Sequence, residues 1–423
     1  MATVSYEECL DRIYKLGRFG IKLELDTILN ILRLLNYPHK NFKTIHIAGT
    51  NGKGSTATYI ASILTRAGFK TGLYTSPHLI RFNERICING EEISDEDVVY
   101  AYEAVNMVDL GKRKATFFEI ATAMALFHFA RQKVDYAVIE TGMGGRFDAT
   151  NIVSPKVSVI TNLSIEHTDY LGNTIAQLAI EKGGIIKHGR PVVTAVSQPS
   201  GLKVLEDLAQ KKNTRLYRYK HDFSARKTPR VRTYAYSGIH SQYDGLVIPL
   251  PGDHQKENMS LALAACELLG EDLTLKDIRT GLGQSRWPGR LEYVQEHPTV
   301  IVDGAHNDKA AKVLATYLRT YLKEKNLTMV LGILDDKPYG SMLKTLTSCA
   351  DRVIFTQATI DRSIEPAQLE KEVKAYFNNE TLIIPDVRQA VSHAIETTGK
   401  DGAVCVAGSL YVAGEAKELF ENN

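Results

Sequence analysis

The chain has 423 residues, of which 44% are hydrophobic and 24% charged, a composition typical of a globular protein long enough for two domains. Lysine and arginine (51) nearly balance aspartate and glutamate (49), so the net charge is +2, which argues against a large nucleic-acid-binding surface but not against a local basic pocket for an acidic ligand. The five cysteines are scattered without a metal-type spacing, which predicts free thiols in a reducing compartment.

The amino-terminal segment, MATVSYEECLDRIYKLG, has early acidic residues and no apolar centre, so it does not read as a signal peptide. The longest apolar stretch, residues 116–130, contains Glu119 and His128 and is too short to span a bilayer. We expect a buried helix there, and a cytoplasmic protein with no membrane partner.

Short β-branched runs alternate with longer amphipathic segments, which predicts an α/β fold with a doubly wound, mostly parallel sheet. In the first part of the chain, strands are expected at 43–49, 134–141, 156–162 and 190–197, and helices at 55–66, 174–187 and 201–210. Residues 215–251 are rich in tyrosine and turn residues with alternating segments, which predicts a small antiparallel addition, and a helix is expected at about 254–269.

A second α/β series begins after the RWPGR loop. Strands are expected at 299–303, 327–331, 352–356 and 403–407, and helices at 309–323, 339–349, 366–377 and 387–398. The sequence therefore predicts a P-loop-containing domain at residues 1–294 and a smaller Rossmann-like domain at 295–423.

The first predicted strand is followed by GTNGKGS, residues 49–55, which is close to a phosphate-binding loop. Glycines let backbone N–H groups surround a phosphate at the amino end of a helix, and Lys53 supplies a charge for the outer phosphates. The usual pattern places Ser or Thr directly after the lysine, whereas here Gly54 intervenes and Ser55 comes one place late. The loop indicates either a variant nucleotide site or a tight turn with a surface lysine.

A carboxylate closes the second strong strand, at the start of ETGMGGRFDATN, residues 140–151. Glu140 ends the apolar run YAVIE, where a carboxylate is costly without a cationic partner. Ligands of open α/β sheets bind beyond the carboxyl ends of the strands. The partner is therefore either Mg²⁺ or a local arginine or lysine.

Further candidates follow later strands. The segment EHTDYLG offers His167, which is a candidate metal ligand beside a nucleotide site and otherwise a structural histidine. Lys182, in EKGGIIK, lies on the next predicted helix and would ordinarily be a solvated lysine. Arg290 of RWPGR and Asp303 of DGAHN fall where two domains would face each other, and would otherwise be a linker arginine and a turn aspartate.

The segment TSPHLIRFNERI, residues 75–86, follows the run KTGLYTS. The hydroxyl of Ser76 is a candidate Mg²⁺ ligand. The segment that follows, with His78, Arg81 and Arg85, is predicted to form a mobile substrate-binding loop.

Eight motifs occur in order along the chain: GTNGKGS, TSPHL, ETGMGGRFDATN, EHTDYLG, EKGGIIK, GDHQKEN, RWPGRLE and DGAHN. Together they make the chain resemble the folylpolyglutamate synthase/dihydrofolate synthase family of the ATP-dependent Mur ligases. The resemblance extends from about residue 19 to residue 415. It accounts for the late Ser55, because the family loop reads Gly-Thr-Asn-Gly-Lys-Gly followed by Ser or Thr.

The resemblance implies a ligase that uses ATP and Mg²⁺ to add L-glutamate to a folate, to dihydropteroate, or to both, through an acyl phosphate. By position it implies an ATP site made by Asn51, Gly52, Lys53, Gly54, Ser55, Asn258, Arg290 and Asp303. It implies Mg²⁺ ligation by Ser76, Glu140 and His167.

Catalytic roles follow from the same resemblance. Lys182 matches a lysine that the family carries as a carbamate, and Lys53, Lys182 and His306 are the candidate catalytic residues. His306 and Ser409 are candidates for the glutamate site.

The resemblance also implies K⁺ as a candidate monovalent cofactor and a monomeric protein. The family often has a proline where Asp308 stands; both residues suit a first helical turn, so we expect a small structural effect.

Two alternatives remain open. A peptidoglycan Mur ligase usually carries a separate amino-terminal domain for its uridine nucleotide, and too little chain precedes Gly49 to form one. A P-loop NTPase switch would hydrolyse ATP without an amino acid, and it expects serine directly after the lysine.

Overall fold

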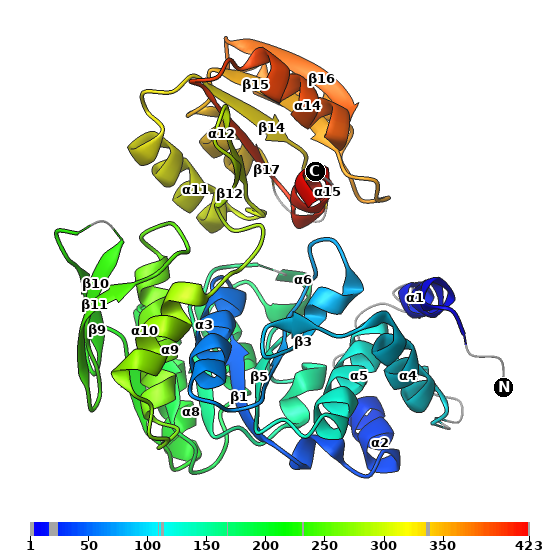
Figure 1. Cartoon of the computed structure of the whole chain (residues 1–423), viewed down its shortest axis with the longest axis vertical. Coiled ribbons are helices and arrows are strands. Elements are labelled where there is room, and N and C mark those ends of the chain that lie inside the picture. Colours follow the sequence, from blue (N-terminus) through cyan, green and yellow to red (C-terminus); the bar gives the residue numbers. More distant parts are fainter. Residues whose placement is uncertain are drawn as a thin grey trace. The chain divides into compact units, whose positions relative to one another are not determined.

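The structure is a computed structural model that describes residues 4–16, 24–108, 110, 114–166, 168–230, 232–335 and 339–421. The chain forms two compact units, each described here by itself (Figure 1). The first consists of Met1–Pro249 and Gln255–Arg286, and the second of Leu250–His254 and Trp287–Asn423. The boundary predicted at residue 294 falls inside strand β12 (Glu292–Gln295), which belongs to the second unit because it pairs with β13 (Thr299–Val302).

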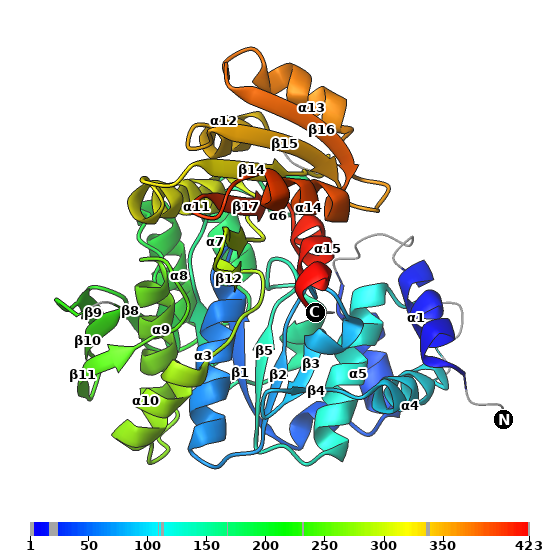
Figure 2. The same ribbon diagram turned by 45° about the horizontal axis from the view of Figure 1, so that its top comes forward.

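Within the described residues, the first unit is built on an eight-stranded sheet in the order β4-β3-β2-β5-β1-β6-β7-β8. The strands from β2 to β8 in that order run parallel, whereas β3 and β4 form an antiparallel edge. Strands β1, β5 and β2 lie side by side in the sheet (Figure 2). The strands are β1 (Lys43–Ala48), β2 (Thr71–Tyr74), β3 (Ile86–Ile88), β4 (Glu91–Glu92), β5 (Tyr136–Glu140), β6 (Val157–Ile160), β7 (Val192–Thr194) and β8 (Leu216–Arg218).

Helices cover this sheet in three groups: α3 packs with α9 and α10, α5 packs with α1, α2 and α4, and α7 packs with α8. They are α1 (Tyr6–Lys15), α2 (Asp26–Leu34), α3 (Lys53–Arg66), α4 (Asp95–Asn106), α5 (Phe117–Arg131), α6 (Thr168–Leu171), α7 (Ile175–Gly183), α8 (Pro199–Lys211), α9 (Gln255–Glu267) and α10 (Leu275–Gln284). Short 3-10 helices are η2 (Pro38–Lys40), η3 (Phe82–Arg85) and η4 (Ala149–Ile152). The predicted buried helix is α5, which begins with a capping box formed by Thr116 and Glu119.

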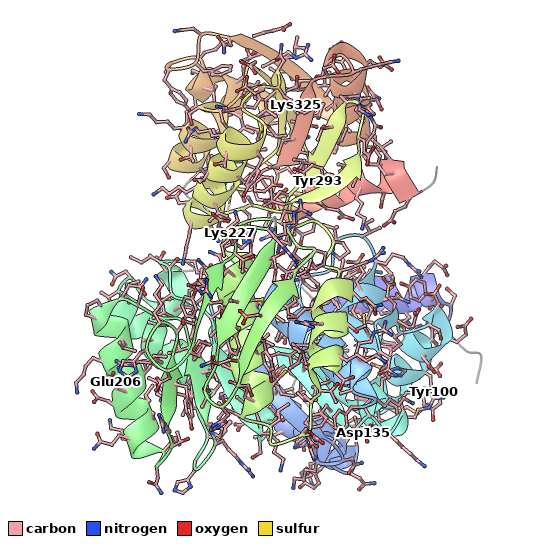
Figure 3. The ribbon with its side chains drawn as sticks, turned by 60° about the vertical axis from the view of Figure 1, so that its left-hand side comes forward. Tyr100, Asp135, Glu206, Lys227, Tyr293 and Lys325 are labelled. Carbon is pink, nitrogen blue, oxygen red and sulfur yellow. The ribbon has the colours of Figure 1, made fainter. Side chains whose placement is uncertain are left out.

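The predicted antiparallel addition is a three-stranded sheet that packs against α9 and α10. Its strands are β9 (Ser224–Lys227), β10 (Thr233–Ser237) and β11 (Gln242–Val247), and Figure 3 labels Lys227 at the end of β9. The hydroxyl of Tyr236 donates to Glu267 of α9 at 3.0 Å, which fastens the sheet to that helix. The start of the predicted region differs: β8 pairs in parallel with β7 and extends the main sheet.

The second unit contains, among its described residues, a six-stranded sheet in the order β12-β13-β17-β14-β15-β16, parallel except for β12. Besides β12 and β13, its elements are α11 (Asp308–Tyr321), β14 (Leu327–Leu331), α12 (Gly340–Thr347), β15 (Arg352–Gln357), α13 (Pro366–Val373), β16 (Glu380–Asp386), α14 (Val387–Thr397), β17 (Ala403–Ala407) and α15 (Leu410–Glu421). Strand β16 was not predicted, because it is a largely solvent-facing edge strand that contains Pro385.

The doubly wound α/β fold predicted for both parts of the chain is confirmed. Of the helices in the described ranges, none combines the length and apolar character needed to cross a membrane.

Candidate active site

The glycine-rich loop joins β1 to α3 and needs two of its glycines. Gly49 and Gly52 have φ of +151° and +83°. A Cβ at Gly49 would lie 1.8 Å from Thr161 Oγ1, and one at Gly52 would lie 2.3 Å from Asn258 Oδ1. Helix α3 begins directly afterwards at Lys53, so the loop meets the positive end of a helix dipole.

Residues that follow β6 hold this loop from one side. Thr161 Oγ1 and Asn162 Nδ2 both donate to the carbonyl of Asn51, at 2.7 and 2.8 Å, and Asn51 N donates to Asn162 Oδ1 at 3.2 Å. The hydroxyl of Thr50 donates to the carbonyl of Ser164 at 3.1 Å. Sequence reasoning missed these partners; the only signal was a Thr-Asn pair at the end of a predicted strand.

Helix α9 supports the loop through Gln255, which is 1% exposed. Its Nε2 donates to Ser55 Oγ at 3.4 Å, and its Oε1 accepts from Asn258 Nδ2 at 3.0 Å and from the Tyr59 hydroxyl at 3.4 Å. The hydroxyl of Ser55 therefore already has a protein partner, and metal ligation by Ser76 stays a prediction. Gln255 stands in the GDHQKEN motif but was not singled out, because nothing in its spacing indicates what it contacts.

Glu140 lies at the carboxyl end of β5, between β1 and β2, and is 4% exposed. Its Oε1 lies 3.7 Å from Nζ of Lys53, and its Oε2 accepts the backbone N–H of Ser76 at 3.2 Å. The local lysine partner considered from the sequence is thus present. The same contacts bring the phosphate-loop lysine and both described candidate metal ligands to one point.

Lys182 is 1% exposed, which excludes an ordinary solvated lysine. Its Nζ donates to the carbonyl of Gly49 at 2.9 Å and lies 3.3 Å from Oε1 of Glu166. Burial, with a smaller contribution from the charge of Lys53, lowers the pKa of Lys182 to about 8 against the opposing effect of Glu166. A larger fraction of neutral amine is therefore present than in a surface lysine.

Lys182 is positioned by close packing between α7 and the loop that follows Glu140. A Cβ at Gly145 would lie 2.8 Å from the carbonyl oxygen of Glu181, and one at Gly184 would lie 2.4 Å from Cα of Arg146. Asn151 Nδ2 donates to the carbonyls of Arg146 and Gly184 at 2.9 and 3.1 Å. The two glycine pairs in the motifs thus allow loop and helix to touch along their backbones.

The predicted substrate-loop residues already have protein partners. Arg85 is 6% exposed and donates from Nε to His78 Nδ1 at 2.7 Å, and burial lowers the pKa of His78 to about 3. Nδ1 accepts, so the proton of neutral His78 is on Nε2. Arg81 pairs with Asp95 at 2.6 Å. Substrate contact by these three residues stays a prediction.

His167 lies outside the described residues, so its predicted role stays a prediction. Among the residues that are described, no group of three or more His, Cys, Asp or Glu side chains could hold a metal ion. The oxygen ligands Glu140 and Ser76 nevertheless suit a hard cation such as Mg²⁺.

The second unit gathers Arg290, Asp303 and His306. The carboxylate of Asp303 accepts the N–H groups of Leu291 and Ala305 at 2.8 and 2.9 Å, and burial raises its pKa against the opposing charge of Arg290. The Arg290 guanidinium lies over Gly304, where a Cβ would come within 2.3 Å of Nη1. His306 Nδ1 is 2.8 Å from the carbonyl of Gly304. Arg290 therefore lies against the turn of residues 303–306 that follows β13.

Ser409, the other candidate for the glutamate site, is 1% exposed, and its Oγ accepts the N–H of Val412 at 3.1 Å at the start of α15. A helix cap explains this serine without a ligand. The structure therefore brings Lys53, Ser76 and Glu140 together in the first unit and Arg290, Asp303 and His306 together in the second, whereas Arg81 pairs with Asp95 instead.

Comparison with known proteins decides the family. Residues 47–266 match the Mur ligase middle domain, and residues 289–410 match the Mur ligase glutamate ligase domain. The dihydrofolate synthase/folylpolyglutamate synthase of Bacillus subtilis is 35% identical over 435 aligned residues, covering 99% of each chain. The chain belongs to the folylpolyglutamate synthase/dihydrofolate synthase family of Mur ligases.

Solved structures of this family have the same fold. The folylpolyglutamate synthase of Mycobacterium tuberculosis, complexed with ADP and AMPPCP, superposes with a TM-score of 0.90 at 32% identity, covering 99% of this chain and 100% of the other. The bifunctional folylpolyglutamate synthase/dihydrofolate synthase of Yersinia pestis, complexed with AMPPNP and a Mn ion, has a TM-score of 0.90 at 29% identity and covers 100% of this chain and 99% of its own. Both family relatives bind an adenine nucleotide, which agrees with a nucleotide-binding GTNGKGS loop.

Proposed function

We propose that this protein is an ATP-dependent ligase that joins L-glutamate to a folate, to dihydropteroate, or to both. One observation carries the proposal: the phosphate loop, its Lys53 and the carboxylate of Glu140 meet at one edge of the sheet, with Lys53 and Glu140 3.7 Å apart. That arrangement suits transfer of a phosphoryl group. Membership of a family whose named members carry out glutamate ligation supplies the acceptor class.

The chemistry needs no protein nucleophile. A carboxylate oxygen of the acceptor attacks the γ-phosphorus of ATP, forming an acyl phosphate and releasing ADP. The amino group of L-glutamate then attacks the acyl carbon, and phosphate leaves. The phosphates are held by the loop residues Asn51, Gly52, Gly54 and Ser55 with their backbone amides, and Lys53 neutralises their charge. Asn258 contacts the nucleotide from α9.

In this proposal Ser76, Glu140 and His167 would hold Mg²⁺, which would supply positive charge to neutralise phosphate oxygens. The donor set fits, because Glu140 and Ser76 already contact each other and offer oxygen. The Mn ion in the Yersinia pestis relative supports a divalent metal in this family. K⁺ is proposed as a monovalent cofactor on the resemblance alone.

Lys182 is proposed to become a carbamate: its neutral amine attacks CO₂, forms an N–C bond and releases one proton. Its burial and its pKa of about 8 favour this reaction. The carbamate would add a negative charge near the phosphate loop, because Nζ lies 2.9 Å from the Gly49 carbonyl.

The second unit is proposed to complete the ATP site with Arg290 and Asp303 and to bind glutamate with His306 and Ser409. The match of residues 289–410 to a glutamate ligase domain supports a role of the second unit in glutamate binding. We further propose a cytoplasmic monomer whose partners are its small-molecule substrates.

The proposal is tested by ADP release from the purified protein, with dihydropteroate or tetrahydrofolate as acceptor. ADP release should require acceptor, L-glutamate and Mg²⁺ together, and mass spectrometry should show one added glutamate per ADP. Preference between the two acceptors identifies which step of folate synthesis the protein serves. Equal ADP release without acceptor or glutamate would instead indicate a nucleotide switch and would overturn the proposal.

A further inference from the structure

The loop that follows β2 contains a carboxylate with an unusual set of partners. Glu84 accepts three successive backbone N–H groups: Leu79 donates to Oε2 at 2.6 Å, and Ile80 and Arg81 donate to Oε1 at 2.7 and 2.6 Å. Charge-assisted hydrogen bonds of this length are strong. One side chain therefore determines the path of the backbone from residue 79 to 81.

Glu84 is itself rigidly placed. It belongs to η3, whose neighbouring residues Phe82 and Asn83 are each 1% exposed. Asn83 Nδ2 donates to the carbonyl of Ile93 at 2.7 Å and to Asp95 at 2.8 Å, beyond the β3–β4 hairpin. The hairpin thus serves as a fixed base from which the Glu84 carboxylate reaches back to the loop.

The other end of the loop is attached to the phosphate-transfer site. Strand β2 lies beside β5 (Figure 2). The N–H of Ser76, which follows β2, donates to Glu140 at 3.2 Å. The nucleotide loop lies on β1, at the opposite side of β5. An acceptor carboxylate that approaches the γ-phosphate without displacing ATP is therefore expected to come from the side of β2.

The middle of the loop carries a surface suited to a flat ring. The His78 ring lies 6.2 Å from that of Tyr14 and 6.4 Å from that of Phe82, and Tyr14 stacks on Phe117 at 5.9 Å. Aromatic faces of this kind bind planar heteroaromatic ligands. Because His78 Nδ1 is occupied by Arg85, the ring presents only Nε2–H as a free donor.

We infer that Glu84 is a positioning residue for the acceptor: it holds residues 76–81 in the conformation that receives the folate or dihydropteroate. The inference rests on the proposed function. Glu84 acts through the backbone and does not touch the reacting atoms. A Mg²⁺ ion bound by Glu140 would compete with the N–H of Ser76 for that carboxylate, and Glu84 would then constrain the loop together with the Arg85–His78 hydrogen bond.

The test is Glu84→Gln, which keeps the shape of the side chain. An amide oxygen accepts at most two of the three N–H groups and turns an NH₂ group toward the third. The KM for the acceptor should rise about tenfold or more, the effect of losing one hydrogen bond to a charged group. The KM for ATP and the Kd for ADP should stay within about twofold, since the nucleotide loop is untouched.

Hydrogen exchange measured by NMR or mass spectrometry provides a second readout that does not depend on turnover. Exchange should accelerate at the amides of Leu79, Ile80 and Arg81 in Glu84→Gln. The matched control is Glu91→Gln, which removes the same charge from an exposed position of the same β3–β4 hairpin and should change neither readout. If Glu84→Gln does not fold, Glu84→Asp, whose carboxylate is withdrawn by one methylene, is measured in the same way with the same expectation.

The outcomes separate this inference from the proposed function. A wild-type protein without acceptor-dependent ADP release overturns the function. An active wild type with an unchanged acceptor KM in Glu84→Gln overturns the inference alone. The inference also fails if the KM values for ATP and acceptor rise equally, or if exchange at residues 79–81 is unchanged.

Discussion

Burial of Lys182 changes which form of its amine is available for chemistry. With a pKa of about 8, about 10% of this amine is neutral at pH 7, against less than about 0.1% for an ordinary lysine. Only the neutral form attacks CO₂. Below pH 8 the ammonium form predominates and is held by Glu166, 3.3 Å away.

Carbamate on Lys182 is therefore expected to increase with pH at constant dissolved CO₂, steeply below about 8, where the amine is also losing its proton, and less steeply above it, where only the proton released by carbamate formation matters. The measurement is ¹³C NMR of the protein in ¹³C-bicarbonate, with the signal followed from about 2 pH units below to about 1 unit above the pKa of Lys182. A signal that is independent of pH, or absent, would contradict the carbamate.

Lys182→Ala provides the control for that signal, which should disappear. The variant should be inactive, and acetate or formate should restore part of its activity by supplying a carboxylate in the space left free. Lys203→Ala, which removes an exposed lysine on α8, should behave like the wild type. Normal activity of Lys182→Ala without added acid would rule out a carbamate role.

At the scale of elements, the contact between α7 and the loop after β5 determines where Lys182 points. Gly184 has helical φ and ψ of −60° and −15°, so its need for glycine is steric and not conformational. A Cβ on residue 184 would lie only 2.4 Å from the Cα atom of Arg146.

Gly184→Ala should therefore destabilise the protein by about 1–3 kcal/mol through overpacking and lower kcat by displacing Lys182. Gly283→Ala is the control, because a Cβ at this position in α10 would meet nothing within 4 Å. It should be neutral or stabilising by up to about 1 kcal/mol. Urea unfolding of both variants measures the difference, and equal free energies of unfolding would contradict the packing argument.

At the scale of the whole molecule, the chain has separate hydrophobic cores. One in the first unit contains Ile28, Met124 and Ile139, and one in the second contains Ile301, Met329 and Phe355. Candidate ATP contacts occur in both units: Lys53 and Asn258 in the first, and Arg290 and Asp303 in the second. An acyl phosphate must be shielded from water, so we expect the nucleotide and acceptor to draw the two units together.

Small-angle X-ray scattering tests this expectation. The radius of gyration should decrease when a non-hydrolysable ATP analogue, Mg²⁺ and a pteroate acceptor are added together, toward the value of about 22 Å expected for a compact chain of this length. The Arg290→Ala variant should show a smaller decrease. An unchanged radius of gyration in the wild type would contradict closure.

Much of this fold could be predicted from the sequence. The strands 327–331 and 403–407 were predicted with the bounds of β14 and β17. Their continuous apolar runs are typical of parallel strands buried on both faces. Edge elements were harder to predict. Strand β16 is largely solvent-facing and contains proline. Strand β12 pairs antiparallel with β13, outside the βα alternation, and the predicted boundary at residue 294 falls within it. Asp308 met its expectation, because α11 begins there behind the capping side chain of Asn307.

The candidate site also has a part that could be predicted from the sequence and a part that could not. The sequence by itself determined the glycine-rich loop, the carboxylate after β5 and the order of the motifs, because these depend on residues adjacent in the chain. Only the tertiary structure decided that Lys182 is buried against Gly49, 133 positions away, that Gln255 holds Ser55, 200 positions away, and that Glu140 meets Ser76, 64 positions away. Such contacts depend on which strands are neighbours in the sheet and on where glycine permits close approach, and neither is encoded in local spacing.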